Sequence, residues 1–273
     1  MIRRDIQLAD GAPGWALISQ IEHARISALL ASHCRGRFGR SNASLIRDEA
    51  IGAIAAHDDG WREWDAAPRL DAEHGRPLSF MELAVSDSTA IWSKSITIAV
   101  EIGPLAAWMV SGHFMRLLEH SEHARCDPVA SAWLAEIGAR REAWFAKWQS
   151  YDPKARDAGV AAETLEWLWT FDEASLWICC QCPVDGEIRR RSADSYTSGR
   201  GTPVEMELAG AGTPASDAPA RGVAHAEPWR FDVESLEFAV SGLLVAARRY
   251  DSPQQLLAAA RPHTLRWLLV ATA

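Results

Sequence analysis

Residues 50–61 read Ala-Ile-Gly-Ala-Ile-Ala-Ala-His-Asp-Asp-Gly-Trp, an apolar run that ends in the adjacent pair His57-Asp58 and then in Gly60. The spacing of the apolar residues predicts a helix from about residue 47 to residue 56, with the pair at its end. A neutral imidazole nitrogen and a carboxylate oxygen from neighbouring residues can bind one cation together. Aspartate at a helix end also caps exposed backbone groups, so the dipeptide alone fits either role.

Two further candidate ligands lie far from this pair in the sequence. His23 lies near the start of a helix predicted from Gln20, and Asp172 lies inside a strongly apolar helix predicted over residues 161–180. A carboxylate that faces a core needs a cation or hydrogen-bond donors to offset its desolvation. Helical proteins build internal metal sites from side chains on facing helices. Taken singly, His23 is equally an ordinary helix histidine, and Asp172 is equally a solvated carboxylate beside Glu173.

A helix predicted over residues 105–122 carries His113 and His120, and His123 follows just past its end. His113 and His120 are two helical turns apart and so lie on roughly the same side of the helix. We therefore include both as candidate metal ligands, whereas His123 is expected to be exposed.

Composition and charge argue against two classes of partner, nucleic-acid polymers and membranes. The chain has 273 residues and a formal net charge of −8. Its one basic cluster, residues 189–191, falls in a loop-like stretch, so a nucleic-acid polymer is not an expected partner. The N-terminal residues lack the apolar core of a signal peptide, and no run approaches the roughly 18 apolar residues of a membrane helix. We therefore expect no membrane association.

The cysteines indicate a reducing compartment. There are five, an odd number, and three of them fall within residues 179–182. Only Cys179 and Cys182 have a spacing that suits zinc, and no second pair or nearby histidine completes a tetrahedral site. Buried reduced thiols and a cytoplasmic location are the expectation.

Helical patterns dominate the first two thirds of the chain. Two short strands, over residues 1–8 and 14–19, are predicted to pair as a hairpin, and residues 65–88 are predicted to form an irregular loop. Helices follow over residues 89–102, 105–122, 128–148 and 161–180. After residue 183 the sequence becomes rich in Ser, Gly, Ala and Pro, with β-compatible runs and one helix-like segment. These later elements are the runs 235–240, 243–250 and 264–271 and the helix 253–260.

The predicted fold class is accordingly mainly α. It consists of a helical bundle with a short N-terminal β-hairpin and a small C-terminal α+β appendage. The expected domains are residues 1–182, which contain the candidate metal site, and residues 183–273, whose function the sequence does not indicate. A homo-oligomer is compatible with this organisation.

Several motifs together resemble a known family. They are Met1-Ile2-Arg3-Arg4, Gln20-Ile21-Glu22-His23-Ala24-Arg25, Ala53 to Trp61, Trp64-Asp65-Ala66-Ala67-Pro68, Gly75-Arg76-Pro77-Leu78-Ser79-Phe80, Val110-Ser111-Gly112-His113-Phe114 and Phe171-Asp172-Glu173-Ala174-Ser175-Leu176. In these motifs the chain resembles an uncharacterised bacterial family catalogued as domain of unknown function 3891. The order His … His-Asp … Asp over helices also resembles the HD-domain superfamily of metal-dependent phosphohydrolases.

This resemblance implies a ligand set and an HD-like fold. The implied ligands of a divalent metal (manganese, magnesium, zinc, cobalt or iron, one or two ions) are His23, His57, Asp58 and Asp172. His113, and less directly His120, would serve a second ion that Asp58 bridges. Where superfamily members often have a lysine near the His-Asp pair, this chain has Asp59.

Candidate catalytic and substrate-binding residues follow if the site holds a metal. Asp58 and Asp59 are the expected catalytic carboxylates. The residues expected to bind substrate are Arg25, Arg62, Arg76 and Trp61.

Three functions remain open on this basis. The first is a metal-dependent phosphohydrolase that acts on a small phosphomonoester or phosphodiester, such as a nucleotide, with metal-bound water as nucleophile. The second is an HD-fold di-iron oxygenase, and the third is a domain that binds a metal or small ligand without turnover.

Overall fold

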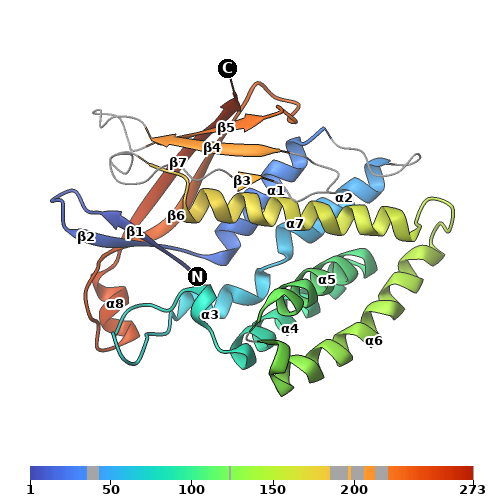
Figure 1. The fold of residues 1–273 in the computed structure, drawn as a ribbon, viewed down its shortest axis with the longest axis horizontal. Coiled ribbons are helices and arrows are strands. Elements are labelled where there is room, and N and C mark those ends of the chain that lie inside the picture. The colour runs from blue at the N-terminus through green and yellow to red at the C-terminus, as the bar shows by residue number, and fades with distance from the viewer. Residues whose placement is uncertain (36–42, 123, 185–195, 198–205, 213–220, 273) are drawn as a thin grey trace.

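One mixed β-sheet and a layered group of helices form the chain in this computed structural model, which describes residues 1–35, 43–122, 124–184, 196–197, 206–212 and 221–272 (Figure 1). The α-helices are α1 (Gln20–His33), α2 (Ala43–Ala56), α3 (Arg62–Ala66), α4 (Val85–Ile102), α5 (Pro104–His120), α6 (Pro128–Ser150), α7 (Ala158–Cys180) and α8 (Pro253–Ala259). Short 3-10 helices are η1 (Asp59–Trp61), η2 (Phe80–Glu82) and η3 (Ala124–Cys126). The strands are β1 (Ile2–Gln7), β2 (Pro13–Ile18), β3 (Tyr196–Thr197), β4 (Glu207–Gly212), β5 (Arg221–Glu227), β6 (Ser235–Ala246) and β7 (Arg261–Ala271).

The sheet joins the two ends of the chain. Its seven strands lie in the order β1-β2-β6-β7-β5-β4-β3. Every neighbouring pair is antiparallel except β5 and β7, which are parallel. The N-terminal hairpin β1–β2 pairs along β6, with Leu17 opposite Leu243 and Ile18 opposite Gly242. Strands separated by more than 200 residues are therefore hydrogen-bonded neighbours.

The predicted fold class is wrong. The molecule is not a mainly α, HD-like bundle with a short hairpin and a small C-terminal α+β appendage, because the hairpin and the C-terminal strands form one mixed sheet. The edge of a two-stranded hairpin leaves backbone donors and acceptors unpaired, and pairing with β6 satisfies them. The division after residue 182 stays a prediction, although strands from both sides of it share the sheet.

Helices α1 and α7 form the layer against the sheet. Helix α7 contacts β1, α1 contacts β6, and the two helices pack on each other (Figure 1). In the first half of β6, every second residue (Leu236, Phe238 and Val240) is buried in the same core as α7. Helices α2 and α5 pack on α7, and α4 and α6 pack on α5. The opposite face of the sheet is partly covered by α8, whose Leu256 is buried with Leu17 and Val245.

Side-chain caps fix where the two inner helices begin. Ser19 accepts a hydrogen bond from the Glu22 amide at the start of α1, and Asp157 accepts one from the Val160 amide at the start of α7. Each cap satisfies one of the free N–H groups in a first helical turn. Because β2 ends at Ile18, one residue before this cap, the position of α1 is tied directly to the sheet.

The predicted helices agree with the observed ones to within about four residues at each end, and the largest differences are the starts of α2 and α4, at residues 43 and 85 where 47 and 89 are predicted. The short helix α3 was not predicted. The two β-compatible runs 235–240 and 243–250 correspond to the single long strand β6 and the turn after it. Residues 189–191 and His123 lie outside the described residues. Among the residues described, none of the helices has both the length and the apolar character needed to cross a bilayer.

The five cysteines are free thiols: Cys34, Cys179 and Cys182 are buried, Cys180 is partly buried and Cys126 is exposed. Burial raises the pKa of Cys180 to about 11, and it raises the pKa of Cys179 further. Arg4 donates hydrogen bonds to the carbonyl oxygens of Cys179 and Cys182, at 3.1 and 2.7 Å. The buried Arg4 guanidinium thus satisfies backbone carbonyl groups that the end of α7 leaves without a partner inside the helix.

Candidate metal centre

Five buried side chains from four parts of the chain converge. His23 comes from α1, His57 and Asp58 from the turn that follows α2, His113 from α5 and Asp172 from α7. We call these five residues the ligand cluster. His23 and His57 are fully buried, and small exposed fractions remain on Asp58 (4 %), Asp172 (5 %) and His113 (2 %).

His57 lies at the centre of the cluster. Its Nδ1–H donates to the carbonyl oxygen of Ile54 at 2.7 Å, so Nε2 is the nitrogen that faces the carboxylates. That Nε2 lies 3.0 Å from Asp172 Oδ1 and 3.5 Å from Asp58 Oδ2. A backbone acceptor therefore selects the ring nitrogen that is left for a metal, as is usual for metal-bound histidine.

His23 is held by a serine that the sequence did not indicate. Its Nε2 lies 2.7 Å from Asp58 Oδ2, and its Nδ1 lies 2.9 Å from Ser175 Oγ. Ser175 Oγ also lies 2.9 Å from the Asp172 carbonyl oxygen and 2.7 Å from Ser27 Oγ, so one hydroxyl joins His23 to both α1 and α7. The arrangement leaves Nε2 of His23 directed at Asp58. Ser175 falls within one of the family-like motifs, but its spacing from Asp172 carries no ligand signal.

His113 completes the cluster from α5. Its Nε2 lies 3.7 Å from Asp172 Oδ2, and its ring packs edge-on against His57 with centroids 5.5 Å apart. Within the described part of the chain, its Nδ1 is buried without a hydrogen-bond partner. A buried imidazole with so few partners is costly unless another group binds it.

The charges of the cluster are arranged around the carboxylates. Burial alone would raise the pKa of Asp58 and Asp172, but the neighbouring imidazoles hold both pKa values below the ordinary range. Burial alone would lower the pKa of His57, yet Asp58 and Asp172 raise that pKa to about 9. Burial lowers the pKa of His113 to about 4. Without a metal, His57 therefore carries the positive charge between two buried carboxylates.

This donor set fits a cation. Two groups of three residues each bring ligand atoms within 4.8 Å of one another: His23, His57 and Asp58, and His57, His113 and Asp172. Both groups include His57. Only Nε2 of His57, with its single lone pair, is left to bind a metal, because Nδ1 donates to the Ile54 carbonyl oxygen. The two groups therefore describe one ion inside the cluster more readily than two separate ions.

A close approach of the backbone positions Asp58. After Asp58 the chain enters η1, where the Gly60 amide donates to Ser95 Oγ on α4 at 3.0 Å. A Cβ atom on Gly60 would lie 2.3 Å from the Ile91 carbonyl oxygen and 2.5 Å from the Ser95 amide nitrogen. Only glycine lets η1 pack this closely against α4, which explains the glycine two residues after the ligand.

The other predicted site residues lie outside the cluster. The three predicted phosphate-binding arginines pair with carboxylates near the surface: Arg25 with Glu22, Arg62 with Asp59, and Arg76 with Asp71 and Glu82. Asp59, the second predicted catalytic carboxylate, is thus held by Arg62 at 3.1 Å.

His120 and Trp61 also contact residues outside the cluster. His120 is exposed at the end of α5 and donates from Nδ1 to the Arg116 carbonyl oxygen at 2.7 Å. Trp61 is buried, and its ring packs edge-on against Trp64 with centroids 6.3 Å apart.

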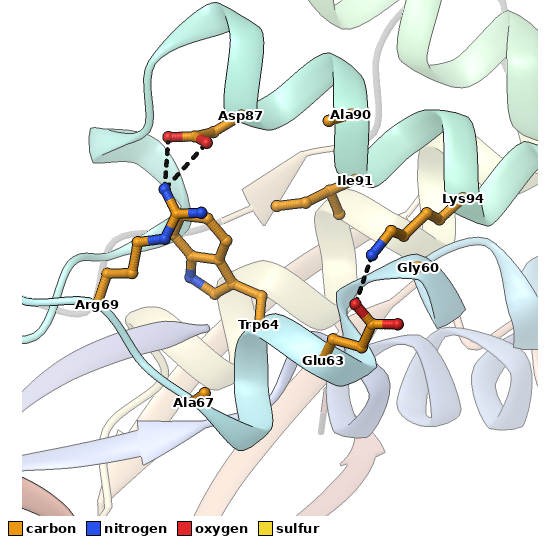
Figure 2. Close-up of a pocket in the computed structure, with 9 residues that line it drawn as sticks. All are labelled: Gly60, Glu63, Trp64, Ala67, Arg69, Asp87, Ala90, Ile91 and Lys94. Atoms are coloured by element: carbon orange, nitrogen blue, oxygen red, sulfur yellow. Dashed lines mark hydrogen bonds and ion pairs between the residues drawn. The ribbon is translucent and has the colours of Figure 1, made fainter. Parts of the chain in front are cut away.

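A surface pocket of about 300 Å³ lies between α3 and α4, next to η1 (Figure 2). Trp64 and Ile91 form an apolar part of its wall. Two ion pairs lie at its opposite ends: Arg69 with Asp87, and Lys94 with Glu63. Gly60, which lines the pocket, follows Asp58 by two residues, but none of the five cluster residues lines the pocket. The pocket and the cluster are therefore separate features.

The fold and the cluster together define an α+β protein with a buried His/Asp centre able to hold a metal ion. A family model described as "Protein of unknown function (DUF3891)" matches residues 1–247, and the chain belongs to this family. The predicted family is thus confirmed, whereas the relation to HD-type phosphohydrolases stays a prediction. Comparison with curated proteins and with solved structures gave no match.

Proposed function

We propose that this protein is a metal-dependent hydrolase that binds one divalent cation in the ligand cluster and cleaves a small phosphate ester. The observation that supports it is the convergence of three imidazoles and two carboxylates, all buried, from four parts of the chain. A divalent cation would balance the two carboxylate charges and replace the proton on His57. The mixed nitrogen and oxygen ligands suit manganese, zinc, cobalt or iron better than magnesium, which prefers oxygen alone.

The order of the ligands along the chain supports phosphate chemistry. His23, the His57-Asp58 pair and Asp172 follow one another as do the ligands of HD-type phosphohydrolases. The proposal rests on this ligand order and on the convergence of the side chains. It does not rest on a shared fold, because the sheet described above is not part of the predicted HD-like bundle.

The residues of the chain position the ligands before any metal binds. Ile54 and Ser175 orient the two histidines, as outer partners do in metal sites generally. When bound, a divalent metal supplies a nucleophilic hydroxide near neutral pH and neutralises charge on a phosphate oxygen.

The di-iron alternative would need more ligands than the cluster offers. His57 binds through a single nitrogen, and His120 projects from the surface end of α5 with its ring 6.0 Å from Trp169. These contacts favour a single ion, and therefore hydrolysis over di-iron oxygen chemistry. Metal analysis of the purified protein separates the two, because the oxygenase requires two iron ions per chain.

Manganese is expected to stabilise the wild-type protein and to support cleavage of a generic aryl phosphate. Free metal at 100 times its Kd adds about 2.7 kcal/mol to the free energy of unfolding. EDTA should reverse both effects. Asp58→Asn should lose both, whereas the surface variant Asp232→Asn should retain them. A melting temperature that manganese does not shift contradicts metal binding, and a shift without cleavage shows a binding protein without hydrolase activity.

A further inference from the structure

A row of interacting side chains connects the ligand cluster to the surface between α5 and α7. On α5 the row consists of His113, Arg116 and His120, and on α7 of Asp172, Trp169 and Glu166. Within each helix these residues are three or four positions apart and so lie on one face. We call these six residues the α5–α7 row.

Contacts run continuously along the row. The His113 ring lies 5.5 Å from the Trp169 ring, centroid to centroid, and the Arg116 guanidinium carbon lies 4.2 Å from the same ring centroid. Arg116 Nη1 also lies 2.8 Å from Glu166 Oε1. One tryptophan thus contacts both a cluster histidine and an arginine.

Exposure rises from the inner to the outer end of the row. His113 is 2 % exposed, the side chains of Arg116 and Glu166 are 31 % and 30 % exposed, and His120 is at the surface. The inner end includes two of the three cluster residues that retain some exposure. The row therefore runs from the surface to His113 and Asp172 of the ligand cluster.

Arg116 has the chemistry to bind an oxyanion in this position. A guanidinium carries five N–H donors, and only Nη1 of Arg116 has a described hydrogen bond, to Glu166. Stacking on Trp169 leaves the edge of the guanidinium plane open for bidentate bonds, which phosphate oxygens accept in matching geometry. Glu166 occupies part of this edge and would compete with an incoming anion.

We propose that the α5–α7 row is the substrate entrance of the metal centre and that Arg116 binds the phosphate group there, in exchange for Glu166. This inference rests on the proposed function and assigns the phosphate contact to a residue other than Arg25, Arg62 or Arg76. It also gives His120 a place at the outer end of the entrance and not among the metal ligands.

Binding of inorganic phosphate to the full-length, manganese-loaded protein tests this assignment by calorimetry. Arg116→Gln should weaken phosphate binding by at least about tenfold, the loss typical of a hydrogen bond between charged groups. Its Kd for manganese should stay within about twofold of the wild type. Glu166→Gln should tighten phosphate binding, because it removes the competing carboxylate, and this gain would not arise from a purely structural role of the pair.

Arg140→Gln is the matched control. Arg140 stacks on Trp144 at 5.0 Å and lies 3.4 Å from Glu136, which reproduces the surroundings of Arg116 on α6. This variant should bind phosphate as the wild type does. Should Arg116→Gln fail to fold, Arg116→Lys and Glu166→Gln provide the test, since lysine keeps the charge and loses the bidentate geometry.

The outcomes distinguish the two proposals. Unchanged phosphate binding in Arg116→Gln, or in both Arg116→Lys and Glu166→Gln, overturns the entrance while the metal centre stands. Manganese binding without any phosphate binding in the wild type does the same. Absence of manganese binding in the wild type overturns the proposed function, and the entrance with it.

Discussion

Replacing His57 by alanine is expected to abolish manganese binding and to destabilise the metal-free protein by about 3–5 kcal/mol. His57 supplies the positive charge between Asp58 and Asp172, with its Nε2 3.0 Å from Asp172 Oδ1. Its removal leaves two buried carboxylates without their central partner, and that loss is far larger than the loss of a surface contact. Urea unfolding in EDTA measures the stability, and electron paramagnetic resonance of bound manganese measures the binding.

His33→Ala provides the comparison for this variant. His33 lies 2.9 Å from Asp232, nearly the same distance, but its side chain is 33 % exposed and that of Asp232 is 57 % exposed. Its replacement should change stability little and leave manganese binding intact. Equal losses of stability in the two variants would contradict the central position that we assign to His57.

Gly60→Ala is expected to lower the free energy of unfolding by about 1–3 kcal/mol, the usual cost of overpacking. The new Cβ would meet backbone atoms of Ile91 and Ser95 at 2.3 and 2.5 Å, so η1 would have to move away from α4. Asp58 immediately precedes η1 and should move with it. We therefore also expect manganese affinity to fall by about tenfold, since displaced ligands bind metal less well. Thermal unfolding and manganese titration measure the two effects.

Gly52→Ala is the control that shows whether the losses in Gly60→Ala result from the close contact of η1 with α4. Gly52 lies in the middle of α2, and a Cβ there would contact only the Ile102 side chain, at 3.9 Å. Alanine should stabilise this helix by about 0.5–1 kcal/mol. Opposite signs are thus expected for the same substitution on the two sides of the His57-Asp58 pair. A stable Gly60→Ala protein with normal manganese affinity would show that η1 does not position Asp58.

The helices were predictable because their signals are local. Apolar spacing, Pro128 at the start of α6 and the apolar run that carries Asp172 mark helices within single windows of sequence. The sheet was not predictable in the same way. Pairing of β2 with β6 depends on residues more than 200 positions apart, and each strand alone fits a hairpin or an appendage as well. The fold class was therefore wrong even though most of its elements were right.

The cluster was predictable from its residue types, histidine and aspartate. The substrate-binding residues were not, because their side-chain directions cannot be read from the sequence. Five of the six predicted metal ligands converge because a buried His or Asp needs partners, so such residues tend to meet. Ser175 was missed, and nothing in the sequence favoured Arg116 as a phosphate ligand, because a serine and an arginine on amphipathic helices are common without any function. The direction in which Arg25, Arg62 and Arg76 project depends on tertiary packing, which neither charge nor motif position reveals.

Pairing of β2 with β6 has a consequence for the order in which the protein is made. All residues of the ligand cluster have been synthesised once residue 172 is added. Helix α1, which carries His23, follows directly after β2, and the edge of β2 that faces away from β1 pairs with β6. At about 5–20 residues per second, a ribosome needs several seconds to go from Asp172 to the end of β6. During that interval the nascent chain has every ligand and lacks the sheet that holds one of them in place. We expect the metal centre to reach its final geometry only after β6 has been synthesised, although β6 contributes no ligand to it.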